Sequence, residues 1–199
     1  MSDPHDDRRI LHPVIMPVPP AIQQLSGREK ILALRRHART ALARSAALNG
    51  LTLGALRKGE RGQPLPSQGV YWSLSHTTEQ VAAVAAPHRV GIDIERITTF
   101  TAALKERVAC SREWELSTVD ELLFCRYWTA KEAVLKAIGV GLGGLSRCAI
   151  TEIIDEGQLR LAYGPETWTV SHCLKAERHL AAITVAAGRV QWHLLDAGF

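Results

Sequence analysis

Residues 90–95 read Val-Gly-Ile-Asp-Ile-Glu, and their alternation of apolar and polar side chains is typical of a strand. Such a strand would bury Val90 and the two isoleucines on one face and project Asp93 and Glu95 from the other, about 7 Å apart. Gly91 leaves room for another element to approach closely. An acidic strand face can also be a solvated edge, so this stretch alone does not establish a site.

Further strands are expected immediately before this segment. Val70, Trp72 and Leu74 alternate with polar residues, and residues 81–86 form a short apolar run that ends at Pro87. The pattern therefore predicts three neighbouring strands between residues 70 and 95.

A long helix is expected on each side of these strands. A Ser-x-x-Glu capping box opens residues 26–48, where apolar residues recur at spacings of three and four. Thr118 and Glu121 form a second capping box ahead of a helix that should end at Ile138, before Gly139. Shorter strand-like runs follow to the end of the chain.

A helix followed by strands thus occurs twice. This order predicts an α+β fold of two similar α/β halves, each a long helix on a small, mainly antiparallel sheet, with the active site in the cleft between them. The expected halves are residues 26–96 and 97–199, as one structural unit. Residues 1–25 hold five of the nine prolines and are expected to be an extended leader.

Composition limits the class of protein. The 199 residues are 46% hydrophobic, and no apolar run approaches the roughly 18 residues of a membrane span, so no membrane association is expected. The N-terminus lacks a signal peptide and the four cysteines lack CxxC spacing, which indicates a cytoplasmic location. A net charge of +4 favours polyanionic or acidic partners, whether nucleic acid, a phosphorylated small molecule or an acidic protein.

The second helix carries a carboxylate and an ammonium group on one face. Glu132 and Lys136 are four residues apart, which is also the spacing of ordinary surface ion pairs. If Glu132 faces Asp93 and Glu95, however, three carboxylates share one site and require a cation. An all-oxygen site of this kind suits Mg²⁺, which completes its shell with water and substrate phosphates, and Lys136 would lie beside those phosphates.

These segments resemble, in order, the motifs of the 4'-phosphopantetheinyl transferase superfamily. The resemblance rests on Gly-Gln-Pro at 62–64, Trp-Ser-Leu-Ser-His-Thr at 72–77, Gly-Ile-Asp-Ile-Glu at 91–95 and Trp-Thr-Ala-Lys-Glu-Ala-Val-Leu-Lys-Ala-Ile-Gly at 128–139. The chain length is similar to that of the larger, pseudo-dimeric type, which activates carrier proteins of peptide, polyketide or fatty-acid synthases.

The resemblance implies roles for particular residues. Mg²⁺ would be held by Asp93, Glu95 and Glu132. Glu132 would also be the candidate base, and Lys136 would stabilise or protonate the departing 3',5'-ADP. The phosphates and nucleotide of coenzyme A, the co-substrate, would be contacted by Arg39, Ser75, His76 and Lys136.

One residue departs from the family pattern. Gln63 stands where the family usually has lysine, so a phosphate contact is in doubt unless Lys58 or Arg61 replaces it.

The predicted function is Mg²⁺-dependent transfer of 4'-phosphopantetheine from coenzyme A to a serine of an apo acyl or peptidyl carrier protein, carried out by a monomer. A Mg²⁺-dependent hydrolase of phosphodiesters or pyrophosphates is the alternative, because it would use the same carboxylates. The arginine-rich helix at 26–48 could instead be a nucleic-acid face, a reading that we disfavour. The pathway that the carrier serves, in fatty-acid or secondary-metabolite biosynthesis, is left open.

Overall fold

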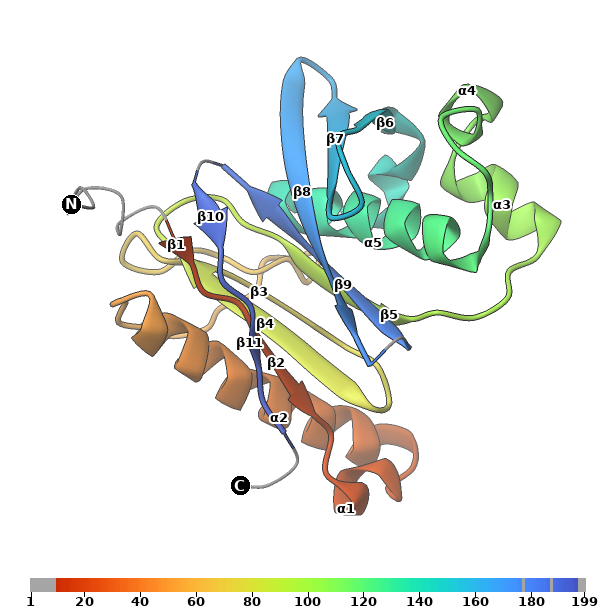
Figure 1. Ribbon diagram of the computed structural model, residues 1–199. Coiled ribbons are helices and arrows are strands. Elements are labelled where there is room, and N and C mark those ends of the chain that lie inside the picture. The colour runs from red at the N-terminus through yellow and green to blue at the C-terminus, as the bar shows by residue number, and fades with distance from the viewer. Residues whose placement is uncertain (1–9, 177, 187, 197–199) are drawn as a thin grey trace, which may run out of the picture.

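The structure is a computed structural model, and it describes residues 10–176, 178–186 and 188–196 (Figure 1). Its helices are α1 (Pro20–Gln23), α2 (Gly27–Leu48), α3 (Ala102–Val108), α4 (Ser111–Trp114), α5 (Glu121–Ile138) and the 3₁₀ helix η2 (Leu142–Arg147). Its strands are β1 (Ile10–Leu11), β2 (Val14–Pro17), β3 (Tyr71–His76), β4 (Gln80–Ala86), β5 (Ile92–Arg96), β6 (Cys148–Ile153), β7 (Gln158–Tyr163), β8 (Glu166–Lys175), β9 (His179–Val185), β10 (Arg189–Val190) and β11 (His193–Leu194).

Two sheets form the centre of the molecule. The first has the order β11-β2-β4-β3, in which only the β11–β2 pairing is parallel, and the second has the fully antiparallel order β5-β9-β8-β7-β6. Strands β1 and β10 form a separate parallel pair. The mixed α+β class expected from the sequence is therefore confirmed.

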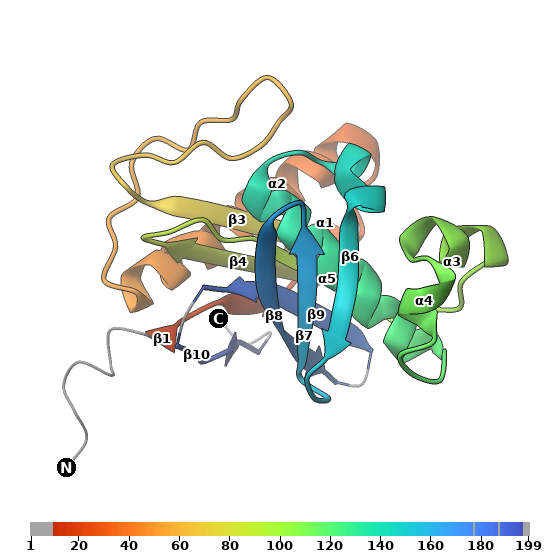
Figure 2. The same ribbon diagram turned by 90° about the horizontal axis from the view of Figure 1, so that it is seen from above.

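Each sheet carries one long helix. The apolar face of α2, with Leu34, Ala38 and Leu42, packs on the first sheet, and the face of α5 with Tyr127 and Val134 packs on the second (Figures 1 and 2). A third apolar cluster fills the space between the sheets, where side chains of β2 and β4 meet those of β5 and β9. The molecule is thus layered as helix, sheet, sheet and helix, and β5 lies at an edge of the second sheet.

The predicted leader is wrong from residue 10 onward. Strand β2 lies inside the first sheet, between β11 and β4, and Val14 and Ile15 are fully buried. Prolines at positions 13 and 17 bracket this strand, which made the segment look like loop. Residues 1–9 of the predicted leader lie outside the described part of the chain.

The chain's last strand also differs from expectation. The run predicted at 190–195 forms the short strands β10 and β11, and β11 pairs with β2 in the first sheet. The boundary expected between residues 96 and 97 therefore does not divide the sheets, because the chain returns to the first sheet at its end.

The capping boxes were placed only in part. Helix α5 begins after Asp120, whose side chain accepts the Leu123 N–H at 2.7 Å, so the box predicted at Thr118 is wrong. Ser26 is the N-cap of α2 but makes no side-chain capping hydrogen bond. The predicted stop at Gly139 is confirmed, since this residue adopts the left-handed conformation with φ of 81°. Of the described helices, none combines the length and apolarity of a membrane span.

Candidate active site

The site forms where β3, β5 and α5 meet. Ser73 Oγ of β3 accepts the Ile92 N–H at 3.1 Å, which joins the edges of the two sheets. On the other side of β5, the backbone of α5 comes so close that a Cβ on Gly91 would lie 1.9 Å from the Ala133 carbonyl oxygen. The close approach expected at Gly91 is therefore confirmed, and α5 is the element that uses it.

Three polar side chains converge at this junction. Lys136 Nζ lies 2.6 Å from Asp93 Oδ1 and 3.0 Å from Ser75 Oγ, and the Ser75 hydroxyl donates to the same Asp93 oxygen at 2.8 Å. Asp93 is 2% exposed, whereas the Lys136 side chain is 28% exposed. Asp93 Oδ2 is buried without a hydrogen-bond partner among the described residues, so this carboxylate retains an unused ligand atom.

A row of side chains on α5 faces the two acidic residues of β5. Trp128, Glu132 and Lys136 recur every four residues and share one helix face. Trp128 Nε1 donates to Glu95 Oε1 at 3.3 Å, and Lys136 contacts Asp93, which puts Glu132 between the two contacts in the row. The sequence predicts Trp128 as a core aromatic; it is instead half-buried beside Glu95, and its spacing from Glu132 was the available signal.

The carboxylates disfavour each other's charge. Burial, reinforced by the negative charge of Asp93, raises the pKa of Glu95 to about 7. Burial and the same Asp93 charge also raise the pKa of Glu132. A bound cation would lift this penalty, because it favours the ionised form of every carboxylate around it.

The residues fit a divalent cation by their chemistry, although the described residues include no group of three acidic, histidine or cysteine side chains already arranged as a metal site. Carboxylate oxygens are the ligands that Mg²⁺ prefers. The unused oxygen of Asp93 and the raised pKa values of Glu95 and Glu132 are the observations that favour such an ion. The ammonium group of Lys136 lies against Asp93 in this arrangement.

Positive charges gather on one side of the carboxylates. Burial lowers the pKa of Lys58, and the charges of Arg35 and Arg39 lower it further. Burial lowers the pKa of His76 as well, followed by the charges of Lys136 and Arg35. Arg39, Ser75 and His76, which the sequence singles out, thus belong to one cationic region; it also contains Arg35 and Lys58, to which the sequence assigns no definite site role.

The hairpin over residues 57–65 forms one wall of this region. Lys58 pairs with Pro64, and Gln63 folds back so that its Oε1 accepts the Arg61 N–H at 3.0 Å and its side chain covers Gly59. A cavity of about 320 Å³ lies between this hairpin and α5 and is lined by Lys58, Glu132 and Lys136, among others.

A second cavity, of about 250 Å³, opens on the Glu95 side of the same helix row. Its lining is mainly apolar, with Leu104, Phe124 and Trp128, and Arg96 also lines it. The carboxylates therefore lie between a cationic cavity and an apolar one, an arrangement that suits a reaction between two different substrates.

Comparison with known proteins gives a consistent result. A family model described as the 4'-phosphopantetheinyl transferase superfamily matches residues 89–185. The chain is 30% identical over 203 residues to a phosphopantetheinyl transferase of Thraustochytrium sp., with 84% of this chain and 70% of that protein covered. It is 34% identical over 149 residues to the 4'-phosphopantetheinyl transferase HetI of Nostoc sp., with 67% of this chain and 62% of that protein covered.

A third relative is the 4'-phosphopantetheinyl transferase Npt of Nocardia iowensis, which is 38% identical over 121 residues. Here the match covers 55% of this chain and 51% of that protein. The chain therefore spans less than two thirds of the length of the Nostoc and Nocardia proteins.

Proposed function

The chain belongs to the 4'-phosphopantetheinyl transferase superfamily, and we propose that it transfers 4'-phosphopantetheine from coenzyme A to a serine hydroxyl of an apo carrier protein. The observation that carries this proposal is the contact of Asp93 with Lys136 and Ser75 beside the cationic cavity. It joins carboxylates suited to a cation with a region suited to phosphates. The 3',5'-ADP part of coenzyme A would occupy that region.

Lys58 takes over the cationic role that Gln63 lacks. Gln63 is engaged within its own hairpin, whereas the ammonium of Lys58 is close enough to Arg35 and Arg39 for their charges to lower its pKa. Three cations that disfavour one another favour a polyanion between them. Arg35, Arg39 and Lys58 would therefore bind phosphates of coenzyme A, together with His76.

The reaction transfers a phosphoryl centre between two oxygens. The serine oxygen attacks the β-phosphorus of coenzyme A, the bond from that phosphorus to the bridging oxygen breaks, and 3',5'-ADP leaves. Glu132 would accept the serine proton, directly or through water, because its raised pKa suits a group that must take up a proton. Lys136 would offset or protonate the charge on the leaving oxygen.

Asp93, Glu95 and Glu132 would hold Mg²⁺, which when bound neutralises charge on the pyrophosphate. Ser75 fixes Asp93 Oδ1 by donating to it, and Trp128 orients Glu95 through its indole N–H. These two hydrogen bonds prepare the carboxylates without using all their oxygens.

We further propose that the two helix-on-sheet halves form a pseudo-dimer with the active site in the cleft between them, and that the protein acts as a monomer. The position of the site at the junction of β3 with β5 and α5 supports this arrangement. The arginines of α2 need no nucleic acid as a partner, since Arg35 and Arg39 already belong to the phosphate-binding region.

The test is to incubate the protein with coenzyme A, Mg²⁺ and apo carrier proteins of the fatty-acid, polyketide and peptide types, and to record their intact masses. We expect at least one carrier to gain a phosphopantetheine group, and its serine-to-alanine variant to gain none. Cleavage of coenzyme A to 3',5'-ADP and free 4'-phosphopantetheine without any carrier adduct would instead indicate the hydrolase. No adduct and no cleavage would refute both reactions.

A further inference from the structure

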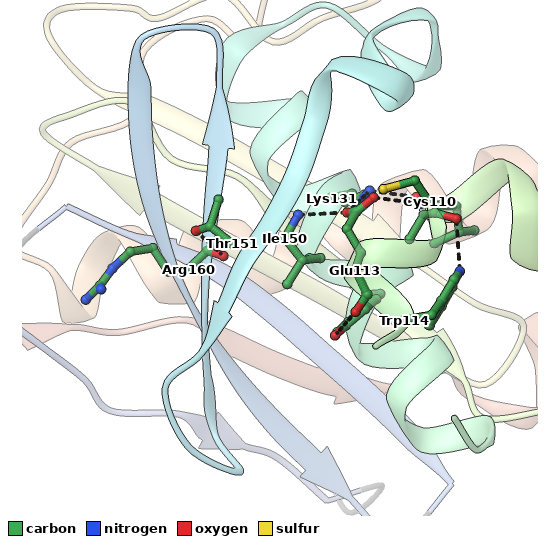
Figure 3. A network of polar contacts seen from close by, with 10 residues as sticks. Cys110, Glu113, Trp114, Lys131, Ile150, Thr151 and Arg160 are labelled. Carbon is green, nitrogen blue, oxygen red and sulfur yellow. Dashed lines mark hydrogen bonds and ion pairs between the residues drawn. The ribbon is translucent and has the colours of Figure 1, made fainter. Parts of the chain in front are cut away.

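Lys131 lies next to Glu132 in sequence but on another face of α5, where it forms a buried ion pair with Glu113 of α4 (Figure 3). Lys131 Nζ is 2.6 Å from Glu113 Oε1, and the two side chains are 2% and 9% exposed. Burial of two charges has a desolvation cost that well-packed apolar side chains would avoid, so such a pair is weak evidence of a role in stability. The position that it fixes is the better guide to its role.

Glu113 joins three elements at one carboxyl group (Figure 3). In addition to Lys131, its Oε1 accepts the Ile150 N–H of β6 at 2.8 Å, and its Oε2 accepts the Cys110 N–H at 2.8 Å. Its backbone carbonyl accepts the Tyr127 hydroxyl of α5 at 2.9 Å. Both carboxylate oxygens are therefore satisfied, and the segment around α4 is tied to α5 and β6 together.

Lys131 also holds the end of α3. Its Nζ donates to the carbonyl oxygen of Val108, the last residue of that helix, at 2.7 Å. Leu104 lies one turn earlier on the same helix face and lines the apolar cavity with Phe124, beside Glu95. The bond from Lys131 to Val108 thus sets how far Leu104 stands from the rest of this cavity.

We propose that Lys131 is a positioning residue, which through Val108 and Glu113 holds α3 as the outer wall of the apolar cavity, and that this wall meets the acceptor protein. This inference rests on the proposed function. Attacking and leaving oxygens lie roughly in line on opposite sides of the transferred phosphorus. Because the cations lie on the Lys58 side, the nucleophile arrives from the Glu95 side, where Leu104 and Arg96 suit an apolar and acidic protein surface.

The first experiment compares Lys131→Met with Arg160→Met, using the apo carrier that the parent protein modifies best. Arg160→Met is the matched control, because it breaks an exposed ion pair with Glu152 in the same half of the molecule. For Lys131→Met we expect the KM for the carrier to rise roughly tenfold or more, while the KM for coenzyme A and the kcat change less than about threefold. The control variant should leave all three constants within that threefold range.

An equal rise in both KM values would overturn the proposal, because it would make Lys131 a general support of the whole site. An unchanged carrier KM in folded Lys131→Met, judged by its circular dichroism, would overturn it as well. Lys131→Arg keeps the positive charge and is expected to recover part of the carrier affinity.

A second measurement on the parent protein covers the case in which Lys131→Met does not fold. Hydrogen exchange is followed with and without an apo carrier whose acceptor serine is replaced by alanine. We expect the amides of residues 98–112 to gain protection with this carrier and not with desulfo-coenzyme A. The opposite pattern, or no change with the carrier, would contradict the proposal. Failure of the proposed function is seen separately, as a parent protein that modifies no carrier.

Discussion

Two lysines on α5, five positions apart, make ion pairs of the same length and opposite character. Lys131 to Glu113 and Lys136 to Asp93 both measure 2.6 Å. In the first pair the ammonium is 2% exposed and both carboxylate oxygens accept backbone N–H groups as well. In the second pair the ammonium is 28% exposed and Asp93 Oδ2 has no partner among the described residues. A pair with every group satisfied holds structure, whereas a pair left incomplete beside a cavity is available to a ligand.

Gly91→Ala is the change that should cause the greatest loss of transfer. The new Cβ would lie 1.9 Å from the Ala133 carbonyl oxygen and 2.7 Å from the Ala137 nitrogen, so α5 must move away from β5. We expect transfer to become undetectable and the free energy of unfolding to fall by about 3 kcal/mol, the upper end of the usual range for overpacking. Denaturant unfolding and the carrier mass assay measure the two effects.

Gly143→Ala is the control for that substitution. A Cβ at Gly143 would meet no atom within 4 Å, so both transfer and stability should stay close to those of the parent protein. If Gly91→Ala behaves like this control, then the close contact of α5 with β5 does not hold Asp93 and Lys136 together.

Asp93→Asn and Glu113→Gln should rank in opposite orders for transfer and for stability. Asp93→Asn should lower the transfer rate roughly a hundredfold, since the charge that faces the substrate is lost. Its free energy of unfolding should change by less than about 1 kcal/mol, because the partly exposed Lys136 can be hydrated.

Glu113→Gln leaves Lys131 buried without its counter-charge and should cost about 3–5 kcal/mol of stability. Its kcat at saturating carrier should remain near the parent value as long as the protein is folded. The same ranking for both measurements would mean that the two ion pairs do not differ in role.

Lys58→Met should have a smaller effect, confined to coenzyme A. Loss of one charge-assisted contact to a phosphate should raise the KM for coenzyme A roughly tenfold and leave the carrier KM unchanged. Arg61→Met, in the same hairpin, is the matched control and should change neither constant. If Arg61→Met raises the KM and Lys58→Met does not, the cation that stands in for Gln63 has been assigned to the wrong residue.

His172 should affect stability without affecting transfer. Burial lowers its pKa to about 4, and its Nε2 contacts the Arg126 carbonyl oxygen at 3.2 Å. Since the unfolded chain titrates near 6.5, the unfolded state binds more protons between the two values. The stability that neutral His172 provides is thus complete above about pH 6.5 and is lost as the pH falls toward 4, by about 1–3 kcal/mol.

His172→Gln should flatten the dependence of unfolding free energy on pH across this window. The transfer rate at neutral pH should be unaffected, because His172 does not line either cavity beside the carboxylates. An unchanged pH dependence in the variant would place the acid-sensitive group elsewhere.

The acidic strand and the helix beside it could be predicted because their signals are local. Alternation over residues 90–95 gives the faces of β5, and the i to i+4 spacing gives the shared face of Glu132 and Lys136. Gly139 marks the end of α5 by its own conformation. None of these features needs a distant partner.

The missed features depend on contacts between residues far apart in the chain. Strand β2 is stabilised by pairing with β4 and with β11, more than 60 and 170 residues away, and its prolines conceal the alternation. The role of Lys131 could not be read either, because Glu113 lies in a four-residue helix that the sequence did not reveal. The cationic region likewise requires the hairpin at 57–65 to fold against α2.

The most direct test of the difference between the two lysines is the kcat of Lys136→Met and Lys131→Met at saturating coenzyme A and carrier. Lys136→Met should lose transfer roughly a hundredfold at any substrate concentration, since its ammonium acts on the reacting phosphates. Lys131→Met should regain nearly the parent kcat once enough carrier is present. Equal losses of kcat in both variants, or a parent-like kcat in Lys136→Met, would contradict this account.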